Sequence, residues 1–175
     1  MLKRFQLEDC KPVSTPMTVG CKLRKGDDSK AVDPKHCRSM IQSLLYVTTS
    51  IPNVKQVVGM MARFQATPKE SHVQAVKIIF RYLKGTIDLD LWYPSKDSFT
   101  LKAYSNADWA GSVDDRKSTS GGSFFLGESL VAWISKKQSS ILLSSTEAKY
   151  IAVEECCTQV EWMKQTLQDI KIVFE

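Results

Sequence analysis

The chain has 175 residues, of which 43% are hydrophobic and 25% are charged, a composition that is typical of a globular protein and excludes a disordered or fibrous one. No apolar run approaches the roughly 20 residues of a membrane-spanning helix, and no long apolar core follows Lys3-Arg4 as it would in a signal peptide. We therefore expect a cytoplasmic or nuclear protein. The formal net charge of +5 suits a nucleic-acid partner, although many proteins without such a partner share it.

Residues 1–37 are rich in turn formers and predict an extended, largely irregular segment. These turn formers include Pro12, Pro16, Gly20, Gly26 and Pro34. The five cysteines of the chain are odd in number and unevenly spaced, so they predict no disulfide framework. His36 beside Cys37 invites a zinc interpretation, but no second close pair of ligands accompanies these two residues.

Residues 38–88 predict three amphipathic helices. The helical pattern begins at Arg38, Pro52 fits the start of a second helix, and a third begins after Pro68 and ends at Gly85. The apolar stripes of these helices include Met40, Ile41, Leu44, Val54, Val57, Val58, Met61, Val73, Val76, Phe80 and Leu83. We expect these stripes to meet in the core of a small helical unit.

After Gly85 the apolar period changes from 3.6 to 2 residues, which indicates strands. We expect a short strand over residues 89–93 and another over residues 99–109. Odd-numbered residues of the second strand would face a core, and even-numbered ones the opposite side. Residues 121–126 and 130–134 predict an antiparallel hairpin that turns at Gly127-Glu128.

A long helix is expected after the hairpin. Ser144 and Glu147 have the spacing of a capping box at its start. Its apolar stripe comprises Ala148, Ile151, Cys156, Val160, Met163, Leu167 and Ile170. A helical unit followed by antiparallel strands and a long helix places the chain in the α+β class.

Several motifs of this second half carry a family resemblance. They are Ala103-Tyr104-Ser105-Asn106-Ala107-Asp108-Trp109-Ala110-Gly111, Asp114-Asp115-Arg116-Lys117-Ser118-Thr119-Ser120-Gly121-Gly122, Ser135-Lys136-Lys137-Gln138 and Ser144-Ser145-Thr146-Glu147-Ala148-Lys149-Tyr150. They resemble the ribonuclease H region of copia-type LTR retrotransposon Pol polyproteins. Upstream motifs resemble the stretch after the reverse-transcriptase palm, among them Asp9-Cys10-Lys11-Pro12-Val13-Ser14-Thr15-Pro16-Met17 and Arg81-Tyr82-Leu83-Lys84-Gly85-Thr86.

The resemblance implies a fold and a chemistry. Residues 38–88 would be a reverse-transcriptase thumb or connection region, and residues 89–175 the first part of a truncated ribonuclease H-like domain. Ribonucleases of this class cut the RNA strand of an RNA–DNA hybrid with a pair of Mg²⁺ ions, which acidic residues hold. By the resemblance, Glu147 is a catalytic and metal-binding acid, whereas Asn106 stands where the family has a catalytic Asp.

The neutral amide of Asn106 cannot replace a bridging carboxylate, and the remaining acids of the family lie beyond the motifs of this chain. Asp108 shares a strand face with Asn106, but it lies about 6–7 Å further along and belongs to the family pattern in its own right. We therefore expect the chain not to bind Mg²⁺ productively and not to be an enzyme by itself. The parent family is an RNA-directed DNA polymerase and ribonuclease H.

Other interpretations stay open from the sequence. Glu147 taken alone is also a favourable acid in the first turn of a helix. Lys136 and Lys137 would contact backbone phosphates, or else form a solvated strand end. The chain as a whole would be a module that binds RNA–DNA hybrid without cutting it, or a ribonuclease that needs a complementing chain. An unpaired sheet edge at residues 99–109 would also favour self-association.

Overall fold

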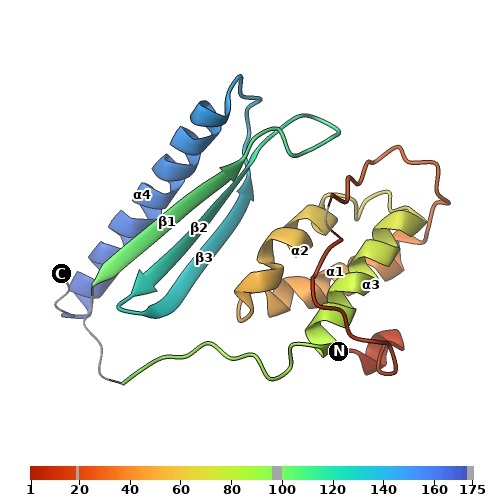
Figure 1. Cartoon of the computed structure of the whole chain (residues 1–175), viewed down its shortest axis with the longest axis horizontal. Helices are drawn as coiled ribbons and strands as arrows, with labels where there is room; N and C mark the ends of the chain where they lie inside the picture. Colours follow the sequence, from red (N-terminus) through yellow and green to blue (C-terminus); the bar gives the residue numbers. More distant parts are fainter. Residues whose placement is uncertain (19, 96–99, 173–175) are drawn as a thin grey trace. The chain divides into compact units, whose positions relative to one another are not determined.

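The computed structural model describes residues 1–18, 20–95 and 100–172 (Figure 1). The chain divides into two compact units, residues 1–89 and residues 90–175. Unit 1 is helical, and unit 2 combines a three-stranded antiparallel sheet with one long helix. The α+β class is therefore confirmed. In the described ranges, no helix has both the length and the hydropathy of a membrane span.

Unit 1 contains three α-helices, α1 (Pro34–Val47), α2 (Lys55–Ala62) and α3 (Glu70–Lys84). Two short 3₁₀ turns, Lys3–Phe5 and Pro52–Val54, precede α1 and α2 respectively. Because Asp33 Oδ1 accepts a hydrogen bond from the backbone N–H of Lys35 and proline is favoured in the first turn, α1 begins four residues before the expected start. The helix α3 ends immediately before Gly85, as the sequence predicts.

The apolar stripes of the three helices form one buried core, as expected. Its residues are Cys37, Met40, Ile41, Leu44, Val54, Val57, Val58, Met61, Phe64, Val73, Ala75, Val76, Ile79, Phe80, Tyr82 and Leu83. Cys37 therefore packs in this core, while His36 lies edge-on to Phe5 with ring centroids 6.1 Å apart. This packing of Cys37 and His36 does not support a zinc site at these two residues.

The N-terminal segment is irregular, as predicted, but it is packed against the helices. The His72 ring accepts the backbone N–H of Lys69 at Nδ1, so Nε2 carries the proton and donates it to the Arg24 carbonyl at 2.9 Å. The Arg81 guanidinium donates to the Lys11 carbonyl at 2.8 Å. Apolar side chains of the segment cover the core, among them Leu2, Phe5, Leu7, Val13, Met17 and Leu23.

The prediction of a strand at residues 89–93 is wrong. These residues have no regular secondary structure, and Leu89 and Trp92 are 63% and 82% exposed. The Tyr93 hydroxyl donates a hydrogen bond to the Leu130 carbonyl at 3.0 Å. Alternating hydrophobicity marks extended backbone, but a strand also needs a partner for its N–H and C=O groups, and the described residues provide none here.

Unit 2 has strands β1 (Leu101–Asp108), β2 (Thr119–Leu126) and β3 (Ser129–Lys137) in the order β1-β2-β3. The predicted hairpin is confirmed at β2 and β3, where Gly127 adopts a φ of 61° in the turn. The helix α4 (Ser145–Asp169) lies along β1 and β2 (Figure 1). Phe99, the expected first apolar residue of β1, lies outside the described residues.

One face of the sheet packs on α4. Its core comprises Leu101, Phe124, Ala132 and Ile134 from the strands with Cys156, Val160 and Met163 from α4. Even-numbered residues of β1 lie on the other face, where the rings of Tyr104 and Phe125 meet edge-on. The predicted alternation is thus confirmed, although Ala103 and Ser105 are exposed.

Candidate functional site

Asn106 lies near the end of β1, paired with Gly121 of β2. The alternation along β1 places its side chain on the sheet face opposite α4. Its side-chain oxygen, Oδ1, accepts a hydrogen bond of 2.9 Å from the backbone N–H of Ala107. This amide oxygen therefore serves the backbone of its own strand.

Glu147 lies in the first turn of α4 and takes part in the cap of that helix. Its backbone N–H donates to the Ser144 hydroxyl at 3.2 Å, and its carboxylate oxygen Oε2 accepts from the backbone N–H of Leu143 at 2.7 Å. The predicted capping spacing thus forms a reciprocal cap, with Leu143 rather than Ser144 as the second donor. The carboxylate has a structural use here that needs no metal.

Asn106 and Glu147 share no hydrogen bond, and each bonds to a neighbouring backbone N–H. The Cys156 thiol lies 3.9 Å from the Tyr104 carbonyl, so this side of α4 lies toward β1. Glu147 precedes Cys156 by nine residues, about two and a half helical turns, and so lies on the other side of the helix. Lys149, about two turns before Cys156, shares the side toward β1.

The residues present do not fit the Mg²⁺ pair of the parent family. Asn106 contributes a neutral oxygen that already accepts a hydrogen bond, and the Glu147 carboxylate caps α4. Among residues 1–18, 20–95 and 100–172, no three His, Cys, Asp or Glu side chains gather closely enough to hold a metal ion. Two-metal chemistry requires several carboxylates around both ions.

Asp108, the one acidic residue of β1, holds the loop that follows it. Its carboxylate accepts the backbone N–H of Thr119, across the start of β2. A side chain at Gly111 would overlap this carboxylate, so only glycine leaves room for the contact. At the two ends of the loop, Ser118 Oγ accepts the Ala110 N–H at 3.0 Å, and the Trp109 indole N–H donates to the Leu142 carbonyl at 3.1 Å. Asp108 is thus a loop-anchoring residue.

A second acid, Asp115, joins the same loop to β3. The Lys137 ammonium lies 2.6 Å from the Asp115 carboxylate and 3.3 Å from the Ser112 hydroxyl. Partial burial acts to raise the pKa of Asp115, but hydrogen bonds from Lys137, Ser112 and the Lys117 backbone, together with the Lys137 charge, outweigh it and lower the pKa from 3.8 to about 2. Lys137, a candidate phosphate contact from the sequence, is therefore engaged within the unit.

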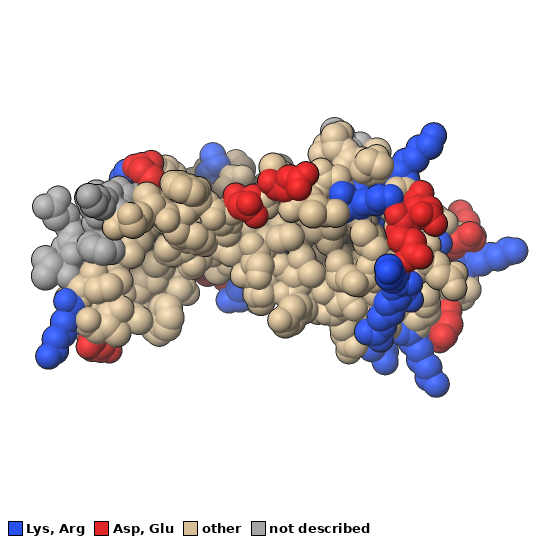
Figure 2. Space-filling view, turned by 90° about the horizontal axis from the view of Figure 1, so that it is seen from below, with Lys and Arg blue, Asp and Glu red and all other residues tan. Residues whose placement is uncertain are grey.

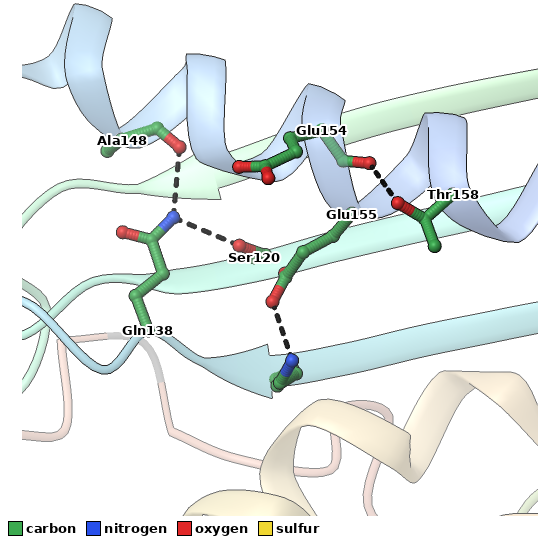
Figure 3. Close-up of polar contacts among 7 residues, drawn as sticks. Ser120, Gln138, Ala148, Glu154, Glu155 and Thr158 are labelled. Carbon is green, nitrogen blue, oxygen red and sulfur yellow. Dashed lines mark hydrogen bonds and ion pairs between the residues drawn. The ribbon is translucent and has the colours of Figure 1, made fainter.

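Lys136 and Gln138 join β3 to α4 (Figure 3). The Lys136 ammonium pairs with the Glu155 carboxylate at 2.9 Å. The buried Gln138 amide donates to the Ser120 hydroxyl at 3.0 Å and to the Ala148 carbonyl at 2.9 Å. Sequence reasoning missed this role of Gln138, although a polar residue at the end of an apolar strand needs hydrogen-bond partners if it is buried.

The positive charge of the chain belongs to unit 1. Residues 1–89 hold 15 of the 24 Lys and Arg residues but 7 of the 19 acidic ones, which gives a formal charge of +8. Residues 90–175 carry −3. The face in Figure 2 shows Lys and Arg side chains with Asp and Glu side chains among them. The charge imbalance between the units is not visible in the overall value of +5.

Comparisons with known proteins identify the family, although no family model and no solved structure matches the chain. The chain is 37% identical over 172 residues, 98% of its length, to the retrovirus-related Pol polyprotein from transposon RE1 of Arabidopsis thaliana. It is 37% identical over 177 residues to the corresponding polyprotein from transposon TNT 1-94 of Nicotiana tabacum. The chain belongs to the copia-type retrotransposon Pol polyproteins.

Both units lie within this copia-type match, because the aligned residues cover nearly the whole chain. The chain spans only 12% and 13% of the length of these two Pol polyproteins. An uncharacterized mitochondrial protein of Arabidopsis thaliana is 32% identical over 93% of this chain, which covers 67% of that shorter relative. The resemblance that the sequence motifs indicate is therefore confirmed.

Proposed function

We propose that this chain is a catalytically inactive segment of a copia-type Pol polyprotein. Residues 38–88 would correspond to the thumb or connection region of reverse transcriptase, and residues 89–175 to the first part of ribonuclease H. The order of elements in unit 2, three antiparallel strands followed by a long helix, supports this correspondence. The observation that carries the proposal is Asn106, an amide where the family places a carboxylate.

The physical reason for inactivity is the charge that a metal pair demands. Carboxylates bind Mg²⁺ by their negative charge and can bridge two ions, whereas an amide oxygen is neutral. Asn106 Oδ1 already accepts the Ala107 N–H, and the Glu147 carboxylate accepts the Leu143 N–H. A metal ion at either side chain would have to compete with the hydrogen bond of that side chain and would find too little negative charge.

Incubation of the purified chain with a labelled RNA–DNA hybrid and Mg²⁺ tests this proposal. We expect no cleavage above background by the chain or by Asn106→Asp, because restoring one carboxylate leaves Glu147 in its cap and Asp108 engaged with the Thr119 N–H. Glu147→Gln is the matched control for traces of contaminating nuclease. Cleavage that Glu147→Gln abolishes would show that the chain is a ribonuclease and that the proposal is wrong.

A second candidate function, binding of hybrid without cleavage, is supported by the charge of unit 1. A formal charge of +8 over 89 residues is a strong source of attraction for a phosphate backbone. Lys136 and Lys137, by contrast, each pair with a carboxylate of unit 2, which is itself acidic. We therefore assign phosphate contact to the helices of unit 1 rather than to the end of β3.

Fluorescence anisotropy with a labelled hybrid, measured from low to physiological salt, tests this assignment. Reversing two exposed charges of α1 in Lys35→Glu/Arg38→Glu should weaken binding about tenfold or more at low salt and flatten its salt dependence. Lys136→Glu is the control in unit 2 and should leave the affinity within about twofold. No binding at low salt, or a larger effect of Lys136→Glu, would contradict the assignment.

A further inference from the structure

The segment that links the two compact units contains a short stretch without backbone hydrogen bonds. Unit 1 ends in a turn, in which the Leu89 N–H donates to the Thr86 carbonyl at 3.2 Å. Further along, the Tyr93 hydroxyl donates to the Leu130 carbonyl at 3.0 Å. Between these two contacts, the backbone groups of residues 90–92 form no backbone hydrogen bond with any described residue. This stretch can therefore leave the surface of the protein without breaking a helix or a strand.

Large apolar side chains occupy the same stretch. Trp92 is 82% exposed, Leu89 and Tyr93 are also exposed, and Leu91 is half-buried. A run of large apolar residues that a core does not cover is costly in water and marks a site of interaction. Pro94 ends the run and has no backbone N–H to donate. The observations thus describe an accessible peptide with apolar side chains on both sides of Trp92.

We propose that residues 89–93 are a proteolytic processing site, at which the chain is cut on one side of Trp92. The partner is an endoprotease with apolar pockets on both sides of the bond that it cuts, and it binds the segment as an extended strand. Water is the second reactant. The C–N bond of the peptide breaks, the residue before it gains a carboxylate, and the residue after it gains an ammonium group. Tyr93 and its hydrogen bond to Leu130 stay with unit 2.

Exposure of an apolar side chain does not by itself single out this segment. Tyr46 is also 82% exposed, but it lies within α1, whose backbone groups are bonded to one another. Leu143 is 86% exposed and lies outside helices and strands, but its backbone N–H donates to the Glu147 carboxylate at 2.7 Å. A protease must bind the backbone N–H and C=O groups of its substrate, so both positions resist cutting more than Trp92 does.

A cut beside Trp92 would leave both units folded and would end the covalent link between them. The helix α3 ends at Lys84 and the strand β1 begins at Leu101, so the cut divides no described helix or strand. Each core draws its residues from one unit alone. Residues 1–89 carry a formal charge of +8 and residues 90–175 carry −3. Processing would therefore separate a basic helical product from an acidic one.

Limited proteolysis of the full chain with chymotrypsin at neutral pH, followed by mass spectrometry, tests the accessibility of the site. The first cut should fall after Leu91 or Trp92, before any cut at Tyr46 or Leu143. Trp92→Pro should abolish this cut, because proline removes the N–H and fixes the backbone at the bonds on both sides. Trp92→Phe is the matched control and should be cut as the original chain is. A first cut at Tyr46 or Leu143, or in Trp92→Pro at the original rate, would refute the proposal.

Expression of the full chain in eukaryotic cells, with a different epitope tag at each end, tests whether the site is processed. We expect two fragments that carry one tag each, loss of both fragments in Trp92→Pro, and their return in Trp92→Phe. Hydrogen exchange of amides in β2 and α3 should be the same before and after the purified chain is cut. Only intact chain in the cells, or loss of protection in either unit after the cut, would overturn the proposal.

Discussion

In unit 2, the side chains of the family motifs mainly contact other residues of these motifs. Asp108 accepts the Thr119 N–H, Asp115 pairs with Lys137, and Gln138 ties β3 to α4. Each of these contacts joins residues between 10 and 22 positions apart. These motif residues therefore secure the loop between β1 and β2 and the contact between β3 and α4, whether or not the chain performs chemistry.

We predict that the Asp115–Lys137 pair contributes acid-sensitive stability to unit 2. The folded pKa of Asp115, about 2, lies below its ordinary value of 3.8, so this stability is present above about pH 4 and is lost as the pH falls toward 2. Because the carboxylate is 39% exposed, solvent screening keeps the contribution to about 1 kcal/mol or less. Urea unfolding of unit 2 at pH 5 and pH 2.5 should show a smaller loss in Asp115→Asn than in the original chain. Equal losses would contradict the role of this pair.

The strand β2 and the helix α4 approach each other closely at Gly122. Gly122 lies directly beneath Cys156, and a Cβ atom there would lie 2.8 Å from the Cys156 sulfur and 2.9 Å from Ile134 Cγ1. The neighbouring Gly121 points to the opposite face, where the nearest atom to an added Cβ is the Asn106 carbonyl oxygen at 3.8 Å. The absence of a side chain at position 122 therefore sets the distance between helix and sheet.

We predict that Gly122→Ala destabilises unit 2 by about 1–3 kcal/mol, because the added methyl group overpacks the contact with α4. Gly121→Ala is the matched control and should change stability by less than about 1 kcal/mol, because its methyl group would make only an ordinary van der Waals contact. Chemical denaturation followed by the circular dichroism of α4 measures both variants. Equal effects of the two substitutions would mean that the close approach of α4 is not what Gly122 permits.

Across the whole molecule, the two units rest on cores of very different size. The core of unit 1 contains sixteen buried apolar residues. The cluster beneath α4 contains three buried ones in the described part of unit 2, Phe124, Cys156 and Met163, with four partly buried residues packed against them. Each core draws its residues from one unit alone. Stability scales with the apolar area removed from water, so unit 2 is the weaker of the two.

We predict two unfolding transitions, of which the first belongs to unit 2. Phe124→Ala should lower the first transition and leave the second unchanged, and Phe80→Ala should do the reverse, each by about 3–5 kcal/mol. Native-state hydrogen exchange of amides in β2 and α3 assigns each transition to its unit. One cooperative transition that responds to both substitutions would show that the units unfold together.

Proline and glycine positions, apolar spacing and the long motifs were enough to predict the helices of unit 1, the hairpin of β2 and β3, the cap of α4 and the family. These signals were enough because helices, hairpins and caps are specified by residues close together in the sequence, and the family is specified by the identity of the motif residues. The prediction of a strand at residues 89–93 was wrong because a strand also depends on distant segments. Alternating hydrophobicity specifies extended backbone but does not supply a neighbouring strand.

The sequence by itself determined that an amide stands at position 106, and with it the expectation of inactivity. Only the tertiary structure decided what the surrounding charged residues do. Lys136 and Lys137 were candidates for phosphate contact, and the fold gives each of them a carboxylate partner. The charge of a side chain is read from the sequence, but what neutralises that charge depends on which distant segments the fold brings within a few ångströms.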